Sequence, residues 1–338
     1  MRKRKIALFL VVSLLLSLVA AGCGKKEQAA TTGQPAAAAQ TVTLGHVGAV
    51  CEAPLFVAYE KGFFKEKGIN VVLYRIPDDA DKKVILATGK VDVTDGVLQT
   101  WLKALESGID MKFTGGTHTG CLSIIALPNS SINSVKDLKG KNVAVSGAIG
   151  GGTMNYAYRA LIKAGLNPAK DVTWKAYPSA QLITALQKGE VDAAVGGDTL
   201  NYTWKDQGQA KIIASMAKDP GFSDEICCLI AFNSNFIAKH PDEAKSITEA
   251  INKATLWVKQ NPEEAARIMV DKKYILGTVP LNTELVKSYD WDPSLDKAKE
   301  ALATSAKEFK AAGILGPDAD IQNYVGKYFV DLPGLTTE

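Results

Sequence analysis

The sequence predicts an α/β protein with two similar lobes, each built around a mostly parallel sheet. Short β-rich runs alternate with helical patterns along most of the chain, which is typical of parallel α/β folds. One unit also recurs at an offset of about 100 residues: residues 86–96 read LATGKVDVTDG, and residues 186–197 read LQKGEVDAAVGG. Each copy predicts a helix that ends at a glycine, Gly89 or Gly189, followed by a Val-Asp strand and a glycine turn.

The elements of the first lobe are expected to recur in the second. The order is strand, helix and strand in both, at residues 42–45, 53–61 and 69–74 and again at residues 141–146, 153–164 and 172–176. After Asn235 the pattern is helical. Pro241 and Pro262 stand near the first position of two of these helices, and acidic residues in the first turn complement the helix dipole.

Two apolar strands stand where the chain is expected to pass between the lobes. Residues 121–130 read CLSIIALPNS and residues 227–235 read CCLIAFNSN. Each is an apolar run that ends at Pro or Asn. They predict two hinge crossover strands that lie side by side. The first lobe is then expected to comprise residues 41–126 and 231–338, and the second lobe residues 127–230.

The N-terminus carries the pattern of an export signal. Four basic residues precede an apolar run over residues 6–19, and three small residues lead to Cys23. This order resembles bacterial lipoprotein signals, which implies removal of residues 1–22 and a lipid on Cys23 that anchors the protein to the membrane. An uncleaved anchor is the alternative, but the apolar run is shorter than the roughly 18–20 residues that spanning requires. Residues 23–40 are expected to form a flexible tether, with an Ala-rich helix as the alternative.

The charge pattern argues against a nucleic-acid partner. The chain has 39 Lys and Arg residues against 36 Asp and Glu residues, and loss of the four basic signal residues would leave the two nearly balanced. The sequence shows no basic stripe, no interleaving of aromatic and basic residues and no zinc-finger spacing. We therefore expect no nucleic-acid binding.

Five segments of the chain are similar to one family of exported binding proteins. They read APLFVAYEKGFFKEKGINV from Ala53, GKVDVTDG from Gly89, SVKDLKGKNVAV from Ser134, LNPAKDV from Leu166 and KGEVDAAVGG from Lys188. Together they resemble periplasmic solute-binding proteins of ABC importers for nitrate, sulfonate, taurine and bicarbonate, including their thiamine-pyrimidine-binding relatives. The resemblance implies a two-lobed periplasmic-binding-protein fold (type II), a monomer that holds solute between its lobes, and ABC permease and ATPase subunits as partners.

Candidate ligand-binding residues follow from the position of the predicted loops. In open parallel sheets, ligands lie beyond the carboxyl ends of the strands. The segment GAIGGGTMNY, from Gly147, directly precedes a helix and is either an anion cradle of backbone N–H groups, which we favour, or only a tight turn. The candidates are His46, Cys51, Asp95, Gln99, His118, Cys121, Gly150, Gly151, Gly152, Thr153, Asp198, Tyr202, Cys227 and Cys228.

The cysteines other than Cys23 all fall on predicted cleft loops or crossover strands: Cys51, Cys121, Cys227 and Cys228. They are either buried small hydrophobes, disulfides that suit an exported protein, or ligands of a soft metal or iron–sulfur cluster. We favour the last, because thiolates select such centres. Consecutive residues of a strand face opposite sides, so only one of Cys227 and Cys228 is expected to bind unless the backbone bends.

Two further kinds of side chain offer rival contacts. A flat ring could be sandwiched by aromatic residues in or just after the cleft loops, which otherwise pack in the core: Trp101, Tyr156, Tyr202 and Trp204. Asp95 and Asp198 are interpreted as equivalent positions of the two lobes. They either bind cationic groups or cap helices, and we favour capping.

The sequence favours a binding protein over an enzyme. It contains no nucleophile elbow, HExxH, P-loop or paired-carboxylate motif, and we expect no catalytic cofactor. We expect an extracytoplasmic component of an ABC importer whose ligand is a thiolate-bound iron–sulfur cluster or soft metal. The alternatives are a small organic or oxoanion solute (sulfonate, taurine, nitrate or thiamine pyrimidine) with structural cysteines and, by family analogy, a thiamine-pyrimidine-synthase-like enzyme.

Overall fold

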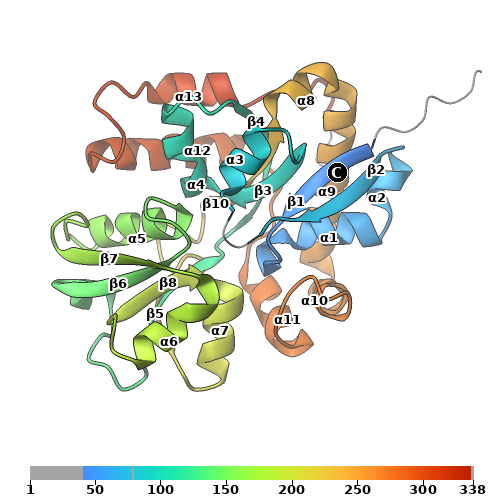
Figure 1. The fold of residues 1–338 in the computed structure, drawn as a ribbon. Helices are drawn as coiled ribbons and strands as arrows, with labels where there is room; N and C mark the ends of the chain where they lie inside the picture. Colours follow the sequence, from blue (N-terminus) through green and yellow to red (C-terminus); the bar gives the residue numbers. More distant parts are fainter. Residues whose placement is uncertain (1–40, 78–79, 336–338) are drawn as a thin grey trace, which may run out of the picture. The chain divides into compact units, whose positions relative to one another are not determined.

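Two five-stranded sheets organise the protein (Figure 1). The structure is a computed structural model that describes residues 41–77 and 80–335. The expected signal peptide, the lipidation site Cys23 and the tether over residues 23–40 lie outside the described residues. Within the described ranges, no helix is both long enough and apolar enough to cross a membrane.

The first sheet has the strand order β2-β1-β3-β10-β4. Its strands are β1 (Thr41–His46), β2 (Asn70–Arg75), β3 (Val93–Val97), β4 (Met111–Thr119) and β10 (Ile226–Asn233). β1 is parallel to β2 and β3, whereas β10 is antiparallel to β3 and β4. The connections contain η1 (Val50–Glu52), α1 (Ala53–Glu60), α2 (Phe63–Glu66), α3 (Lys82–Ala87) and α4 (Leu98–Glu106).

The second sheet repeats this arrangement in the order β7-β6-β8-β5-β9. Its strands are β5 (Leu122–Ala126), β6 (Lys141–Ser146), β7 (Val172–Tyr177), β8 (Ala193–Gly197) and β9 (Lys211–Ser215). β6 is parallel to β7 and β8, and β5 is antiparallel to β8 and β9. The connections contain η2 (Val135–Leu138), α5 (Gly152–Lys163), η3 (Ser179–Gln181), α6 (Leu182–Gln187) and α7 (Asp198–Asp206).

The chain crosses between the sheets just before β5 and just before β10. Each of these strands joins the sheet that it enters. The expectation that the two crossover strands lie side by side is therefore wrong, because β5 and β10 belong to different sheets. Residues 122–126 therefore pair within the second sheet and residues 226–230 within the first, which differs from the expected division after residues 126 and 230. Both strands are buried along their whole length, so their apolar pattern carries no sign of which sheet they join.

The two crossover segments touch. A Cβ atom at Gly120 would lie only 2.5 Å from the Cβ atom of Ala217 and 2.6 Å from its Cα atom. Gly120 also has a φ of 71°, a conformation that favours glycine. This position therefore accepts only a residue without a side chain.

The repeated units are built in the same way. Asp92 accepts a hydrogen bond from the backbone N–H of the third residue of β1, and Asp192 accepts one from the second residue of β6, at 2.8 Å in both lobes. Gly89 and Gly189 follow α3 and α6 with φ of 73° and 70°, which confirms the predicted helix ends. The duplication is therefore visible in hydrogen bonds as well as in strand order.

The remainder of the chain is mainly helical, as predicted. The helices are α8 (Ser234–Lys239), α9 (Pro241–Gln260), α10 (Pro262–Asp271), α11 (Val279–Ser288), α12 (Leu295–Ala311) and α13 (Ile321–Tyr328). α9 packs on α1, and α12 packs on β4 and β10. Pro241 and Pro262 occupy the first turns of α9 and α10, where the missing N–H costs nothing.

A buried ion-pair network links α5 to α12. The guanidinium group of Arg159 in α5 is fully buried and binds the carboxylates of Glu225 and Glu308. Glu225 belongs to the second crossover segment and Glu308 to α12. Lys163, one turn along α5, binds Glu308 at 2.9 Å. The network therefore joins elements of both sheets.

Candidate functional site

Three thiol sulfurs meet where the chain crosses between the sheets. The Sγ atoms of Cys51, Cys121 and Cys228 all lie within 4.8 Å of one another, and those of Cys121 and Cys228 are 3.9 Å apart. Cys121 and Cys228 are buried, Cys51 is partly exposed, and all are free thiols. They come from the β1–α1 connection, the first crossover and β10, so three distant segments supply one centre.

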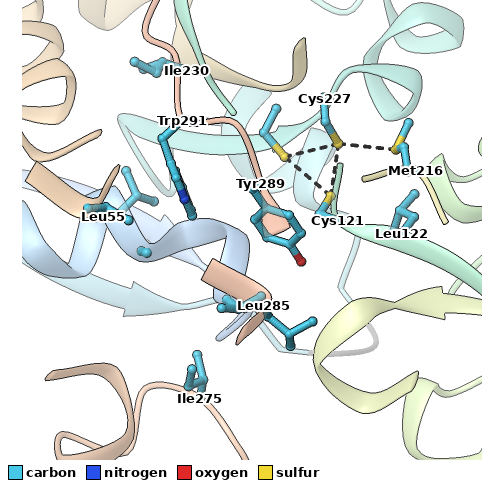
Figure 2. Close-up of a cluster of buried hydrophobic side chains, with 14 of the residues drawn as sticks. Leu55, Cys121, Leu122, Met216, Cys227, Ile230, Ile275, Leu285, Tyr289 and Trp291 are labelled. Atoms are coloured by element: carbon cyan, nitrogen blue, oxygen red, sulfur yellow. Dashed lines mark hydrogen bonds between the residues drawn. The ribbon is translucent and has the colours of Figure 1, made fainter. Parts of the chain in front are cut away.

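Cys227 and Cys228 sit where β10 is irregular. The register between β10 and β4 shifts on both sides of Cys228, so the backbone bends there. The Sγ atom of Cys227 lies 3.0 Å from Cys121 Sγ and 3.5 Å from Met216 Sδ, and Figure 2 shows these sulfurs gathered together. The distance to Cys121 is longer than the ~2.05 Å of a disulfide. Both vicinal sulfurs are therefore near Cys121, but only Cys228 belongs to the three-thiol group.

A buried carboxylate holds the loop that carries Cys51. Glu52 is fully buried, and its two oxygens accept hydrogen bonds from the backbone N–H groups of Val47, Gly48 and Ala49 at 2.8 to 3.1 Å. Lys82, the first residue of α3, binds Glu52 at 3.3 Å and donates to the carbonyl oxygen of Asp95 at 2.9 Å. The Glu52 carboxylate therefore holds the backbone of this loop in place and, with it, the position of Cys51.

His118 and Asp95 bring a nitrogen and a carboxylate to the same place. Together with Cys228 they place ligand atoms within 4.8 Å of one another. His118 Nδ1 donates to the carbonyl oxygen of Thr119 at 3.0 Å, which leaves the lone pair on Nε2. That Nε2 atom and both oxygens of Asp95 are buried without a hydrogen-bond partner among the described residues. Buried polar atoms are normally hydrogen-bonded, so these three atoms point to a binding partner that the described residues do not supply.

The thiols differ in acidity because their surroundings differ. Hydrogen bonds with the thiols of Cys121 and Cys228 hold the pKa of Cys51 well below its ordinary value. Burial raises the pKa of Cys228 and that of Cys227 well above theirs. Burial also raises the pKa of Asp95, and the nearby Glu52 carboxylate adds to the shift. Cys51 is thus the thiol most easily converted to thiolate.

The second sheet contributes contacts at the start of α7. Tyr289 directly follows α11. Its hydroxyl donates to Asp198 Oδ2 at 3.1 Å, and its ring stacks on His118 with ring centroids 5.1 Å apart. The backbone N–H of Val50, next to Cys51, donates to Thr199 Oγ1 at 3.3 Å. Burial raises the pKa of Asp198 to about 6, although hydrogen bonds with Ser123 and Tyr289 oppose the shift.

The capping role expected for Asp95 and Asp198 is wrong, and so is their equivalence. Asp95 lies in the middle of β3, and α7 begins at Asp198 after Gly197, with no side-chain cap. The shared glycine turn aligns Gly96 with Gly196, so Asp95 corresponds to Val195. The two carboxylates flank the site from different sheets instead.

The glycine-rich turn before α5 packs against the first sheet's helix α4. A Cβ atom at Gly152 would lie 2.2 Å from Thr100 Oγ1, and Asn155 donates to the carbonyl oxygen of Gln99 at 2.9 Å. The Thr153 hydroxyl donates to the carbonyl oxygen of Ser146 at 2.8 Å, which closes the turn itself. Gly150 is exposed and Gly151 partly so. Anion binding by this turn stays a prediction.

The other candidates lie in different surroundings. His46 is buried, its ring contacts Phe56 and Tyr274, and burial lowers its pKa. Gln99 is buried with its side-chain oxygen unpaired among the described residues. Tyr202 lines a cavity of about 520 Å³ between α7 and α11, with the ammonium groups of Lys205 and Lys218 over its ring.

Three of the aromatic residues considered for ring stacking pack in the cores. Trp101 is fully buried and donates its indole N–H to the carbonyl oxygen of Gly96 at 3.1 Å. Tyr156 packs edge-on against Phe222, and Trp204 belongs to the core of the second sheet. These side chains are unavailable to sandwich a ligand.

Sequence reasoning missed the residues that support the centre. Glu52, Lys82, Tyr289 and Met216 contact its side chains or their loops, but none belongs to a recognisable motif. The one usable signal was Glu52, a charged residue directly before an apolar helix, since such a residue is rarely buried without a role.

Comparison with known proteins agrees with this architecture. The chain matches the sequence model of the family described as NMT1/THI5 like over residues 51–265. It is 27% identical over 308 residues to the 4-amino-5-hydroxymethyl-2-methylpyrimidine phosphate synthase of Aspergillus parasiticus, which covers 82% of this chain and 83% of the relative. It is 28% identical over 292 residues to a putative aliphatic sulfonates-binding protein of Bacillus subtilis, covering 82% and 84%.

Solved structures give the same fold. The alkanesulfonate-binding protein SsuA from Xanthomonas axonopodis pv. citri, bound to MOPS, superposes with a TM-score of 0.70 and 18% identity, over 83% of this chain and 96% of that one. The likeness establishes the periplasmic-binding-protein fold. Because the family match spans more than half of the sequence, the chain belongs to the NMT1/THI5-like family.

Proposed function

We propose that this protein is the extracytoplasmic solute-binding component of an ABC importer, and that its cargo is a thiophilic metal species, either a soft metal or an iron–sulfur cluster. The observation that carries the proposal is the convergence of Cys51, Cys121 and Cys228 with His118 and Asp95, whose polar atoms are buried and unpaired among the described residues. Thiolates select such cargo over hard cations.

The arrangement also supports capture by closure of the two lobes. The thiols lie on the first sheet and the crossover, while α7 of the second sheet reaches them through Thr199 and Asp198. A ligand that occupied the centre would strengthen these contacts between lobes, as in hinge closure around a solute. Small-angle scattering of the full-length protein should give a smaller radius of gyration with cargo than without it. Binding without compaction would contradict closure.

Metal analysis tests the cargo directly. The full-length protein is purified in detergent without air, and bound metal and sulfide are measured together with the visible absorption spectrum. We expect metal binding that Cys51→Ser and Cys121→Ser abolish, while both variants keep the parent's unfolding temperature. Stable disulfides in the active form, or undiminished solute binding by both variants, would favour an organic or oxoanion solute with structural cysteines instead.

The proposal extends to the membrane and to the importer. A lipid on Cys23 would keep the body near the permease, and mass spectrometry of membrane-extracted protein should find cleavage after Gly22 and a lipidated Cys23. Retention of Met1 would contradict this.

An enzymatic alternative deserves its own test because curated relatives are named as pyrimidine phosphate synthases. We propose binding rather than catalysis, since the sequence lacks a catalytic motif and begins with an export pattern. Release of 4-amino-5-hydroxymethyl-2-methylpyrimidine phosphate by the purified protein would overturn that choice.

A further inference from the structure

We infer that the centre binds a single divalent transition-metal ion through mixed sulfur, nitrogen and oxygen ligands, rather than an all-thiolate cluster. The inference rests on the proposed function and narrows its cargo. Two groups of three ligand atoms share Cys228: one adds Cys51 and Cys121, the other adds His118 and Asp95. Within each group the atoms lie within 4.8 Å of one another, and the group of Cys228, His118 and Asp95 by itself offers sulfur, nitrogen and oxygen.

The sulfur spacing fits one ion. Two thiolates bound to one tetrahedral zinc at about 2.3 Å stand roughly 3.8 Å apart. The Sγ atoms of Cys121 and Cys228 are 3.9 Å apart. In a [4Fe–4S] cluster each cysteine binds a different iron atom, so the cysteine sulfurs stand farther apart. The observed spacing therefore fits a single ion better than a cluster of that kind.

The unpaired atoms indicate which further ligands take part. His118 Nε2 carries its lone pair because Nδ1 donates to the Thr119 carbonyl, the arrangement that orients a metal-binding imidazole. Asp95 holds both oxygens unpaired in the described part of the chain, although it is almost fully buried. A cation between these three atoms and the thiols would give each of them a partner.

The donor mixture selects the class of ion. Sulfur, imidazole and carboxylate together suit divalent ions of intermediate softness, such as zinc, cobalt, nickel or ferrous iron. Calcium and magnesium prefer oxygen alone. Three thiolates and a carboxylate exceed the charge of one such ion, and Lys82, which pairs with Glu52, lies near the site with Nζ 2.9 Å from the Asp95 carbonyl oxygen.

Cys227 provides a matched control within the same cluster. Its Sγ atom contacts those of Cys121 and Cys228 and the Sδ atom of Met216, but Cys227 belongs to neither group of ligand atoms. A cluster that needs four thiolates would recruit it. A mixed-ligand ion would not.

Cobalt(II) is the probe because its spectrum reports both the number of thiolates and the geometry. The reduced full-length protein is titrated in detergent without air. We expect one cobalt per chain, a sulfur-to-cobalt charge-transfer band, and competition by zinc. Cys228→Ser should weaken the band, because two of the three thiolates remain. His118→Ala and Asp95→Asn should weaken affinity by more than about tenfold and shift the ligand-field bands, since loss of even an outer-shell partner costs that much. Cys227→Ser should match the parent. Thermal unfolding of each variant without metal verifies that it folds.

Three outcomes overturn the inference. If His118→Ala and Asp95→Asn bind cobalt as the parent does, with unshifted bands, the nitrogen and oxygen are not ligands. If incubation with iron and sulfide loads several iron atoms with sulfide, and Cys227→Ser prevents this, the cargo is a cluster and the proposed function survives without this inference. If neither cobalt nor an iron–sulfur species binds, both fail together.

Discussion

The β3–α4 and β8–α7 segments are copies of one unit, and the comparison separates what builds the fold from what builds the site. Both copies carry an aspartate, Asp92 or Asp192, that accepts a hydrogen bond from the neighbouring parallel strand, β1 or β6. Three residues beyond it, the first copy has Asp95 and the second has Val195. The frame is shared, whereas the buried charge occurs in one copy only.

The difference shows that the two lobes have unequal tasks. Cys51, Asp95, His118 and Cys228 all belong to the first sheet or its loops, so this lobe supplies most of the proposed ligands. The second lobe contributes Asp198 and Thr199, which contact the first lobe rather than the thiols. Under the proposed function, the first lobe holds the cargo and the second closes over it.

The largest expected effect concerns the contact between the lobes. Arg159 and Lys163 both bind Glu308, but the Arg159 side chain is fully buried whereas that of Lys163 is 35% exposed. We expect Arg159→Met to lower the free energy of unfolding by about 3 kcal/mol, because Glu225 loses its ion-pair partner and Glu308 keeps only Lys163. Lys163→Met should cost less than about 1 kcal/mol. Chemical denaturation measures both, and equal losses would mean that burial of the guanidinium does not matter.

A second comparison tests whether the copies share a frame. Asp92→Ala and Asp192→Ala should each lower the free energy of unfolding by about 1.5–3 kcal/mol, because each removes a charged acceptor from a strand N–H group. Both variants should keep the parent's affinity for cobalt. If only one of the two variants loses stability, the copies resemble each other in sequence but not in how they stabilise the fold.

Replacing Asp95 by its counterpart in the other copy separates stability from binding. Asp95→Val should raise the free energy of unfolding of the metal-free protein by about 1–3 kcal/mol, because an unpaired buried carboxyl is removed. It should also weaken cobalt binding at least about tenfold. Calorimetry gives both quantities. A variant that is less stable than the parent would assign Asp95 a structural role.

The smallest effect concerns closure. Tyr289→Phe keeps the ring stacked on His118 but removes the hydroxyl that donates to Asp198. We expect a loss of about 1 kcal/mol, or roughly fivefold in affinity. Tyr158→Phe, on a ring that stacks with Trp174 in the second lobe, should leave affinity unchanged. Equal affinities for the two variants would mean that the Tyr289–Asp198 contact does not contribute to binding.

Local patterns predicted most of the fold, because strands and helix ends depend on neighbouring residues. The glycines after α3 and α6 and the prolines that open α9 and α10 are examples. The crossover strands were found, but their sheets were not, since a fully apolar strand fits either one. Glu52 escaped notice because its partners become visible only when the loop is folded. Asp198 was aligned with Asp95 because both are acidic residues near a glycine turn, although the register differs.

The contact between Gly120 and Ala217 has a topological consequence. Since the second lobe begins and ends at adjoining points of the chain, it is an insertion within the first. A linker of a few residues could join β4 to the segment before β10 and leave the order β2-β1-β3-β10-β4 uninterrupted. The first lobe, which carries Cys51 and Cys228, and the inserted second lobe are in this sense exchangeable modules. A different closing module could be grafted at the same two ends to change what the protein encloses while the thiols stay where they are.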